Sequence, residues 1–98
     1  MLLAINANNT LTKFALYDGD TARGNWRLAT QPARTADEYF VWLAQLMALA
    51  GEDRAAIDAA IIATVVPPSL FHLKQLCRQH FGCEPLVVGE SDVKLGMN

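Results

Sequence analysis

The sequence has little positive charge and no basic stripe. Its 98 residues carry 8 Lys and Arg against 10 Asp and Glu, a formal charge of -2. Binding to a nucleic-acid backbone depends on a concentrated positive surface. The charge pattern therefore favours no nucleic-acid partner.

Long apolar runs and cysteine pairs are also missing. No stretch reaches the roughly 20 apolar residues that a membrane helix needs. Residues 1–4 lack the basic flank and long apolar run of a signal peptide. The two cysteines, Cys77 and Cys83, do not form a CxxC pair. These absences predict no membrane association and a reduced, cytoplasmic setting.

What remains is the composition of a small folded protein. Hydrophobic residues make up 52% of the chain and charged residues 18%. This balance is typical of a globular protein and not of a disordered one. The length predicts a single domain over residues 1–98.

Three consecutive strands are predicted at the start, over residues 2–7, 12–17 and 21–29. The first is apolar enough to be buried on both faces. Asn8-Asn9 supplies the first turn, where we expect a positive φ, and Asp18-Gly19-Asp20 supplies the second. Tight turns between neighbouring strands predict an antiparallel meander.

A helix is predicted over residues 35–50. Thr35 followed by Glu38 is a capping-box pattern, and Gly51 is a suitable stop. Its apolar side chains form an unusually wide face, which predicts self-association. The expected stripe is Phe40, Leu43, Met47 and Ala50, widened by Trp42, Leu46 and Leu49.

The second half predicts a strand, a helix and a short strand. Residues 57–66 read as a continuous buried strand, residues 68–81 as a helix and residues 86–88 as a strand, whereas 91–98 show no pattern. The order β-β-β-α-β-α-β predicts an α/β fold with a mixed five-stranded sheet. This is the ribonuclease H-like arrangement, one half of an actin-like kinase fold.

Several segments resemble type III pantothenate kinases. "LLAINANNT" is similar to the opening of that family, whose first strand ends in D-x-G-N-T. The likeness continues through "FALYDGD", "RTADEYFVWLAQL", "ATVVPPSLF" and "CRQHFGCEPLVVG", and covers nearly the whole chain. Asn9 and Thr10 match the family pattern, but Asn6 replaces its aspartate and Asn8 its turn glycine.

The resemblance implies ATP-dependent phosphorylation of pantothenate, the first step of coenzyme A biosynthesis. By resemblance, the nucleotide phosphates would contact Asn6, Asn8, Asn9, Thr10, Thr12 and Lys13. Asn6 would hold Mg²⁺ only weakly, because it is uncharged. Lys13 is a possible compensation. The loss of charge at Asn6 also argues against a nuclease, which needs several carboxylates around two metals.

The family's G-A-D-R segment, with its catalytic aspartate, would follow "VKLGMN". We therefore expect an N-terminal lobe that is not catalytic alone and binds ATP and Mg²⁺ weakly or not at all. A self-paired or assembled ATP-dependent enzyme is the alternative, and a non-catalytic regulator is a third reading. The expected partners are a second copy or a missing second lobe. Whether the two asparagines are natural or deliberate changes stays open.

No carboxylate is predicted to be catalytic. Asp18 and Asp20 are explained by turn formation, and Asp37 and Glu38 by a helix N-terminus. Cys77, His80 and Cys83 have a CxxHxxC spacing that suggests zinc, but His72 is a poor fourth ligand. The pattern favours packing over a structural metal, and Trp26 and Trp42 are expected in the core or an interface.

Overall fold

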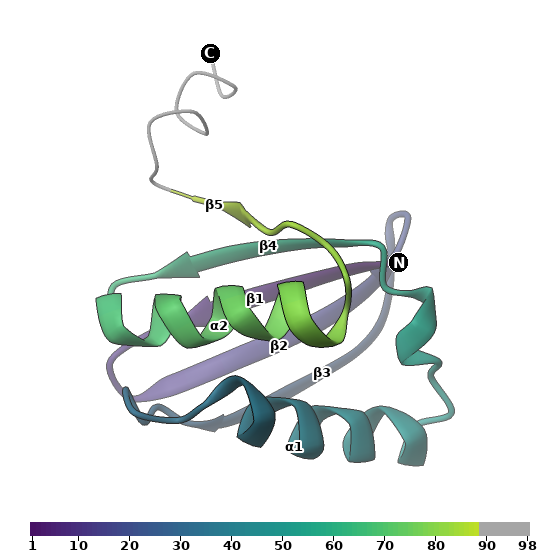
Figure 1. The fold of residues 1–98 in the computed structure, drawn as a ribbon. Coiled ribbons are helices and arrows are strands. Elements are labelled where there is room, and N and C mark those ends of the chain that lie inside the picture. Colours follow the sequence, from purple (N-terminus) through teal and green to yellow (C-terminus); the bar gives the residue numbers. More distant parts are fainter. Residues whose placement is uncertain (89–98) are drawn as a thin grey trace.

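The computed structural model describes residues 1–88. It contains five strands, two α-helices and one turn of 3₁₀ helix (Figure 1). In chain order they are β1 (Leu2–Ala7), β2 (Leu11–Asp18), β3 (Thr21–Ala29), α1 (Ala36–Leu49), η1 (Arg54–Ala56), β4 (Ala59–Thr64), α2 (Pro67–His80) and β5 (Leu86–Val87).

The strands form one mixed sheet in the order β3-β2-β1-β4-β5. β1 pairs antiparallel with β2 and parallel with β4, and β4 pairs parallel with β5. The predicted order of elements and the ribonuclease H-like arrangement are confirmed.

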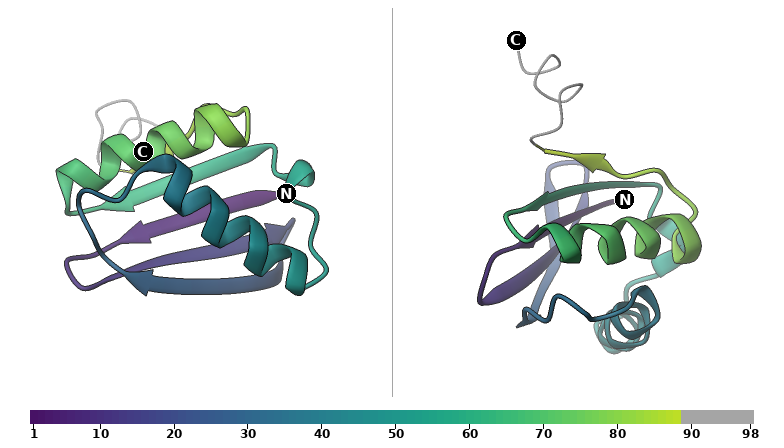
Figure 2. Two further views of the ribbon diagram at one scale, coloured as in Figure 1. Left: turned by 60° about the horizontal axis from the view of Figure 1, so that its bottom comes forward. Right: turned by 60° about the vertical axis from the view of Figure 1, so that its left-hand side comes forward.

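Both helices lie on the same face of the sheet (Figure 2). The crossovers through α1 and α2 both lead in the same direction across the sheet. Right-handed crossovers in one direction place their helices on one side. In the described residues, the opposite face of the sheet therefore has no covering element.

The hydrophobic core fills the space between the sheet and the two helices. Phe14 of β2 lies at its centre, with ring centroids 5.8 Å from Tyr39 and 5.3 Å from Trp42. Trp26 also packs against this core, which confirms the prediction that both tryptophans lie in the core or an interface. The other large, fully buried side chains are Leu3, Leu16, Leu43, Met47, Ile62, Leu73 and Leu76.

The buried stripe of α1 differs from the predicted one. Tyr39 is fully buried, whereas Phe40 is only partly buried and Ala50 is exposed. The helix caps agree with prediction: Thr35 and Glu38 form the capping box, and Gly51 follows with φ +77°. Neighbouring residues in the sequence determine where α1 begins and ends. The rotation of α1 about its own axis is instead determined by the packing of Tyr39, Leu43 and Met47 on the sheet.

The prediction that β1 and the 57–66 strand are buried on both faces was wrong. Burial alternates along each, with Leu3 and Ile5 inside β1 and Ala60 and Ile62 inside β4. The reason is that only one sheet face is covered by helices. β4 is also shorter than predicted, since the 3₁₀ turn and Ile57 precede it.

Neither helix within residues 1–88 has the length and apolar character needed to cross a membrane.

Candidate functional site

The β1–β2 connection is a short, exposed loop of Asn8, Asn9 and Thr10 at the carboxyl end of β1. The last strand pair is Ala7 with Thr12, and the Asn8 N–H donates to the Leu11 carbonyl at 2.9 Å. Neither asparagine has a positive φ, so that prediction was wrong. Four residues, 8–11, lie between the paired Ala7 and Thr12. A turn of this length does not need the left-handed residues of a two-residue hairpin.

Thr30, just after β3, holds this loop in place. Its N–H donates to the Thr10 carbonyl at 2.9 Å, and its hydroxyl donates to the Asn8 carbonyl at 2.7 Å. The Thr30 and Thr12 hydroxyl oxygens are 2.9 Å apart. The loop is therefore tied to the end of β3 as well as to its own strands.

The other side of the loop is tied to β4. The Thr64 hydroxyl donates to the Ala7 carbonyl at 2.9 Å and accepts from the Val66 N–H at 2.9 Å. The crossover into α2 thus begins against the end of β1. Loops at the carboxyl ends of parallel strands are the usual ligand sites of open α/β sheets.

The start of α2 offers no free N–H group to an anion. Its first two residues are Pro67 and Pro68, which have no N–H. The next two N–H groups, of Ser69 and Leu70, both donate to the Val66 carbonyl. This helix N-terminus is therefore closed, unlike those that bind phosphate.

Two backbone N–H groups of the loop are free. Within residues 1–88, the N–H groups of Asn9 and Thr10 have no hydrogen-bond partner. Successive free N–H groups in a fixed turn can bind an anion. At this end of the sheet, the loop and not the start of α2 therefore presents free backbone donors among the described residues.

The structure separates the six residues predicted to contact phosphate. Asn8, Asn9 and Thr10 are together in the exposed loop. Thr12 is fully buried and points to the helix-covered face, where it cannot reach a ligand on the open face. Asn6 and Lys13 are exposed and lie opposite each other on β1 and β2.

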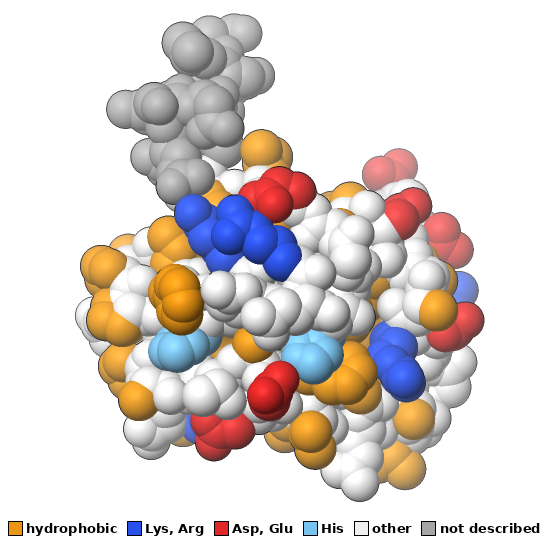
Figure 3. All heavy atoms as spheres, viewed as in Figure 1, with side chains coloured by type: hydrophobic (Ala, Val, Ile, Leu, Met, Phe, Trp, Pro, Cys, Tyr) orange, Lys and Arg blue, Asp and Glu red, His pale blue; other side chains and the backbone are white. Residues whose placement is uncertain are grey.

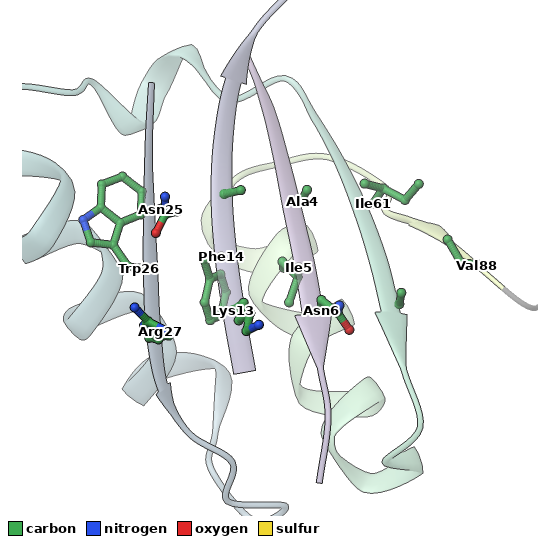
Figure 4. Close-up of a pocket in the computed structure, with 12 residues that line it drawn as sticks. Ala4, Ile5, Asn6, Lys13, Phe14, Asn25, Trp26, Arg27, Ile61 and Val88 are labelled. Atoms are coloured by element: carbon green, nitrogen blue, oxygen red, sulfur yellow. The ribbon is translucent and has the colours of Figure 1, made fainter. Parts of the chain in front are cut away.

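The uncovered face of the sheet carries a hollow of about 420 Å³ (Figure 4). Its lining includes the small side chains Ala4, Ala15 and Ala63, together with Ile61 and Val88. These residues alternate with core residues along their strands, so they belong to the open face. The hollow is apolar toward β4 and β5.

Polar side chains border the hollow on the side of β2 and β3. Lys13 pairs with Asn6 across β1–β2 and with Arg27 across β2–β3, so the three side chains lie at one level on three adjacent strands (Figure 4). Arg27 was not predicted as a site residue. Its alternation with Trp26 and Leu28 indicates an outward side chain, but its register with Lys13 is not readable from the sequence.

A magnesium ion does not fit the residues at Asn6. The Asn6 amide has no charge, and its cross-strand partner is the cation Lys13. Mg²⁺ prefers carboxylate and phosphate oxygens and is repelled by a neighbouring ammonium group. Within residues 1–88, no group of three or more His, Cys, Asp or Glu side chains is placed to hold a metal.

A buried polar cluster lies beneath the loop on the helix-covered face. The Tyr39 and Ser69 hydroxyl oxygens are buried, and neither has a hydrogen-bond partner of good geometry in the described residues. The Thr12 and Ser69 hydroxyls are nevertheless close enough to Tyr39 to lower the pKa of its phenol slightly. Burial raises the pKa of the Tyr39 phenol, and the Arg34 guanidinium opposes this rise. The phenol is therefore neutral at physiological pH and not a base.

The carboxylates singled out in the sequence are engaged elsewhere. Asp18 ends β2 and Asp20 lies in the β2–β3 turn, at the opposite end of β2 from the loop. Glu38 closes the capping box, and hydrogen bonds from the Thr35 backbone and hydroxyl lower the pKa of its carboxyl. Asp37 contacts His80 Nε2 at 2.9 Å, at the end of α2.

The CxxHxxC segment is used for packing. His80 stacks on Phe40 with centroids 4.2 Å apart, besides its contact with Asp37. Cys77 is fully buried in the core, and burial raises the pKa of its thiol to about 12. Cys83 packs against the core, and burial also raises the pKa of its thiol. Packing and the Asp37 contact account for these three residues, and the described part of the chain does not group them as metal ligands.

On the helix-bearing face, the hydrophobic side chains of the described residues are dispersed (Figure 3). In Figure 3, hydrophobic side chains on this face are interspersed with basic, acidic and histidine side chains. The exposed large hydrophobic residues Val41, Leu49, Val65 and Phe71 come from different parts of the two helices and the β4–α2 junction.

Comparison with known proteins points to one family. The sequence model of the family described as "Type III pantothenate kinase" matches residues 2–98. A protein of that description from Paramagnetospirillum magneticum is 58% identical over 98 residues, which is 100% of this chain and 38% of the relative. Another from Rhodospirillum rubrum is 58% identical over 97 residues, 99% of this chain and 38% of the relative. The chain thus spans about 38% of the length of these relatives.

Among solved structures, the fold is similar to YeaZ from Pseudomonas aeruginosa. The TM-score is 0.60 with 18% sequence identity, over 89% of this chain and 42% of that chain. At this identity the likeness bears on the fold alone.

Proposed function

Because the chain belongs to the type III pantothenate kinase family, we propose that it forms the N-terminal lobe of an ATP-dependent kinase. The substrate proposed is pantothenate, which places the reaction at the first step of coenzyme A biosynthesis. In this proposal the lobe contributes the β1–β2 loop to the nucleotide phosphates and does not catalyse alone.

The two free N–H groups of Asn9 and Thr10 are the observation that carries the proposal. The bonds from Thr30 and the Asn8–Leu11 bond fix the loop before any ligand arrives. A fixed donor pair loses little conformational entropy on binding a phosphate. The side-chain changes at Asn6 and Asn8 leave these backbone donors in place.

A second lobe is needed for the chemistry in this proposal. Phosphoryl transfer requires a group that positions or deprotonates the attacking hydroxyl. In residues 1–88, Asp37 and Glu38 are engaged in α1, and Asp18 and Asp20 lie at the other end of β2. The remaining carboxylates are engaged as well: Glu52 with Arg23, Asp53 with the Ala55 N–H, Asp58 with the Met1 ammonium and Glu84 with Arg78. In this proposal the catalytic carboxylate therefore comes from outside the described residues.

The open sheet face is the surface we propose for the second lobe. It combines an apolar hollow with a polar border that ends beside the loop. A nucleotide between the two lobes would meet the loop and this border together. A cytoplasmic location is proposed with it, in keeping with the two free cysteines.

A chimera tests the proposal. Residues 1–98 replace the matching part of the Paramagnetospirillum magneticum relative, and ATP-dependent phosphorylation of pantothenate is measured. We expect activity in the chimera and none in the purified 98-residue chain. A folded chimera without activity would contradict the kinase function, and activity of the 98-residue chain would contradict the need for a second lobe.

Thr10→Pro in the chimera tests the loop itself, because proline removes one of the two free N–H groups. We expect a rise of about tenfold or more in KM for ATP, as for the loss of a hydrogen bond to a charged group. Thr10→Ala, which keeps the N–H, is the matched control.

A further inference from the structure

Lys13 and Arg27 form an unusual pair of like charges. They are direct cross-strand partners on β2 and β3, and both are exposed. Like charges directly opposite each other destabilise a sheet. Within residues 1–88, neither side chain has an ion pair or a hydrogen bond. The fold therefore places two cations side by side without a compensating anion.

Asn6 lies next in the same row, opposite Lys13 on β1. A carboxylate at this position would face the Lys13 ammonium and neutralise it. The amide keeps the charge of the row at two positive units and offers N–H donors. The row begins one residue from the loop, since Ala7 and Thr12 form the last pair of the hairpin.

We propose that Asn6, Lys13 and Arg27 form a cationic strip that binds the nucleotide phosphates and neutralises them without a metal at Asn6. The inference rests on the proposed function. The Lys13 and Arg27 side chains would donate charged hydrogen bonds to phosphate oxygens. The Asn6 amide would also donate a hydrogen bond to a phosphate oxygen, whereas a carboxylate at this position would repel the phosphate. In this arrangement the uncharged Asn6 and the cation Lys13 act together: the amide leaves the positive charge of Lys13 available to the phosphates.

The strip and the hollow have different roles in this arrangement. The apolar lining lies toward β4 and β5, whereas the cations lie on β2 and β3. A phosphate chain that starts at the loop N–H groups can continue along the strip without crossing the apolar lining. The open face thus provides separate surfaces for a polypeptide and for an anion.

Titration with ATP, in EDTA and in excess Mg²⁺, tests the strip in the 98-residue chain. Binding is measured by calorimetry and by amide NMR shifts. We expect ATP to bind in EDTA at least as tightly as with Mg²⁺. Lys13→Met and Arg27→Met should each raise the Kd for ATP in EDTA about tenfold. Arg54→Met, far from the loop in η1, is the matched control and should leave the Kd unchanged.

The Asn6→Asp variant gives an independent readout. It should weaken ATP binding in EDTA and make added Mg²⁺ strengthen it. Unchanged Kd values in Lys13→Met and Arg27→Met, or wild-type binding that requires Mg²⁺, would overturn the strip while leaving the loop as a phosphate site. No binding of ATP under either condition would overturn the strip and the proposed role of the loop together.

Discussion

The Thr12 and Thr30 hydroxyl oxygens lie 2.9 Å apart, one at the start of β2 and one just past the end of β3. Thr30 uses its single O–H on the Asn8 carbonyl, so Thr12 must donate to Thr30. The fully buried Thr12 hydroxyl thereby has an acceptor, and the loop is fixed through it. A core residue and a candidate ligand loop share one hydrogen-bond chain.

Thr30→Val should break this chain. The buried Thr12 hydroxyl loses its acceptor and the Asn8 carbonyl loses its donor. We expect the free energy of unfolding to fall by about 1–3 kcal/mol. Amide exchange at Asn9 and Thr10 should become faster relative to the strands. Chemical denaturation and hydrogen exchange measure the two effects, and Thr30→Ser, which keeps the hydroxyl, should change both much less. Equal losses in the two variants would contradict the role given to the hydroxyl.

The Tyr39 hydroxyl should behave in the opposite way. It is buried without a hydrogen-bond partner in the described residues, so its removal leaves no other group unpaired. Tyr39→Phe should change the free energy of unfolding by less than about 1 kcal/mol, in either direction, because removing an unpaired buried hydroxyl can stabilise the fold. Tyr39→Leu, which also removes the ring beside Phe14, is the comparison and should cost several times more. A large loss in Tyr39→Phe would show that the hydroxyl has a partner after all, such as an ordered water.

Local features of the fold were readable from the sequence. The capping box of Thr35 and Glu38 and the stop at Gly51 depend on neighbouring residues, and the observed helix follows them. The turn at Asn8-Asn9 was predicted with the wrong backbone conformation because its loop length depends on the strand register. Tyr39 was missed as a core residue because helix rotation depends on distant partners.

The site was less readable, because it depends on which strands are neighbours. Lys13 and Arg27 are 14 positions apart in the sequence, and only the β2–β3 register brings them together. The open sheet face follows from the placement of both helices on one side. Neither fact can be read from a short segment.

The Cys77 thiol predicts a loss of stability at alkaline pH. Burial raises its pKa to about 12, whereas an unfolded thiol titrates near 8.5–9. Above that pH the unfolded chain releases a proton that the folded chain retains, so the unfolded state is favoured. We expect the free energy of unfolding to fall by about 1 kcal/mol between pH 9 and 10 from this group.

Cys77→Ala is the variant that tests the thiol. It should be less stable at neutral pH, because the core loses volume, but its stability should depend less on pH between 9 and 10. Urea unfolding of the wild type and the variant at several pH values measures how the free energy of unfolding depends on pH. Cys83→Ala is the comparison: burial also raises the pKa of the Cys83 thiol, but Cys83 is less buried, so its removal should change the pH dependence less. An unchanged slope in Cys77→Ala would rule out the thiol as the source.

Self-association of the 98-residue chain should use the open sheet face. The sequence had suggested the wide face of α1, but the helix-bearing surface is mixed in character, with hydrophobic groups dispersed among charges (Figure 3). The open face instead carries an apolar hollow lined by Ala4, Ala15 and Ala63. Apolar surface of this kind favours association. We expect light scattering to show a mass above that of the monomer at high concentration.

Two charge insertions separate the two surfaces. Ala4→Glu places a carboxylate on the open face and should restore the monomer mass, because association would bury that charge. Leu49→Glu replaces a residue of α1 that is 83% exposed and should leave association unchanged. The reverse pattern would assign association to the helix, and a monomer at all concentrations would remove the prediction. Circular dichroism of both variants checks that each remains folded, so that a change of mass reports on the surface and not on unfolding.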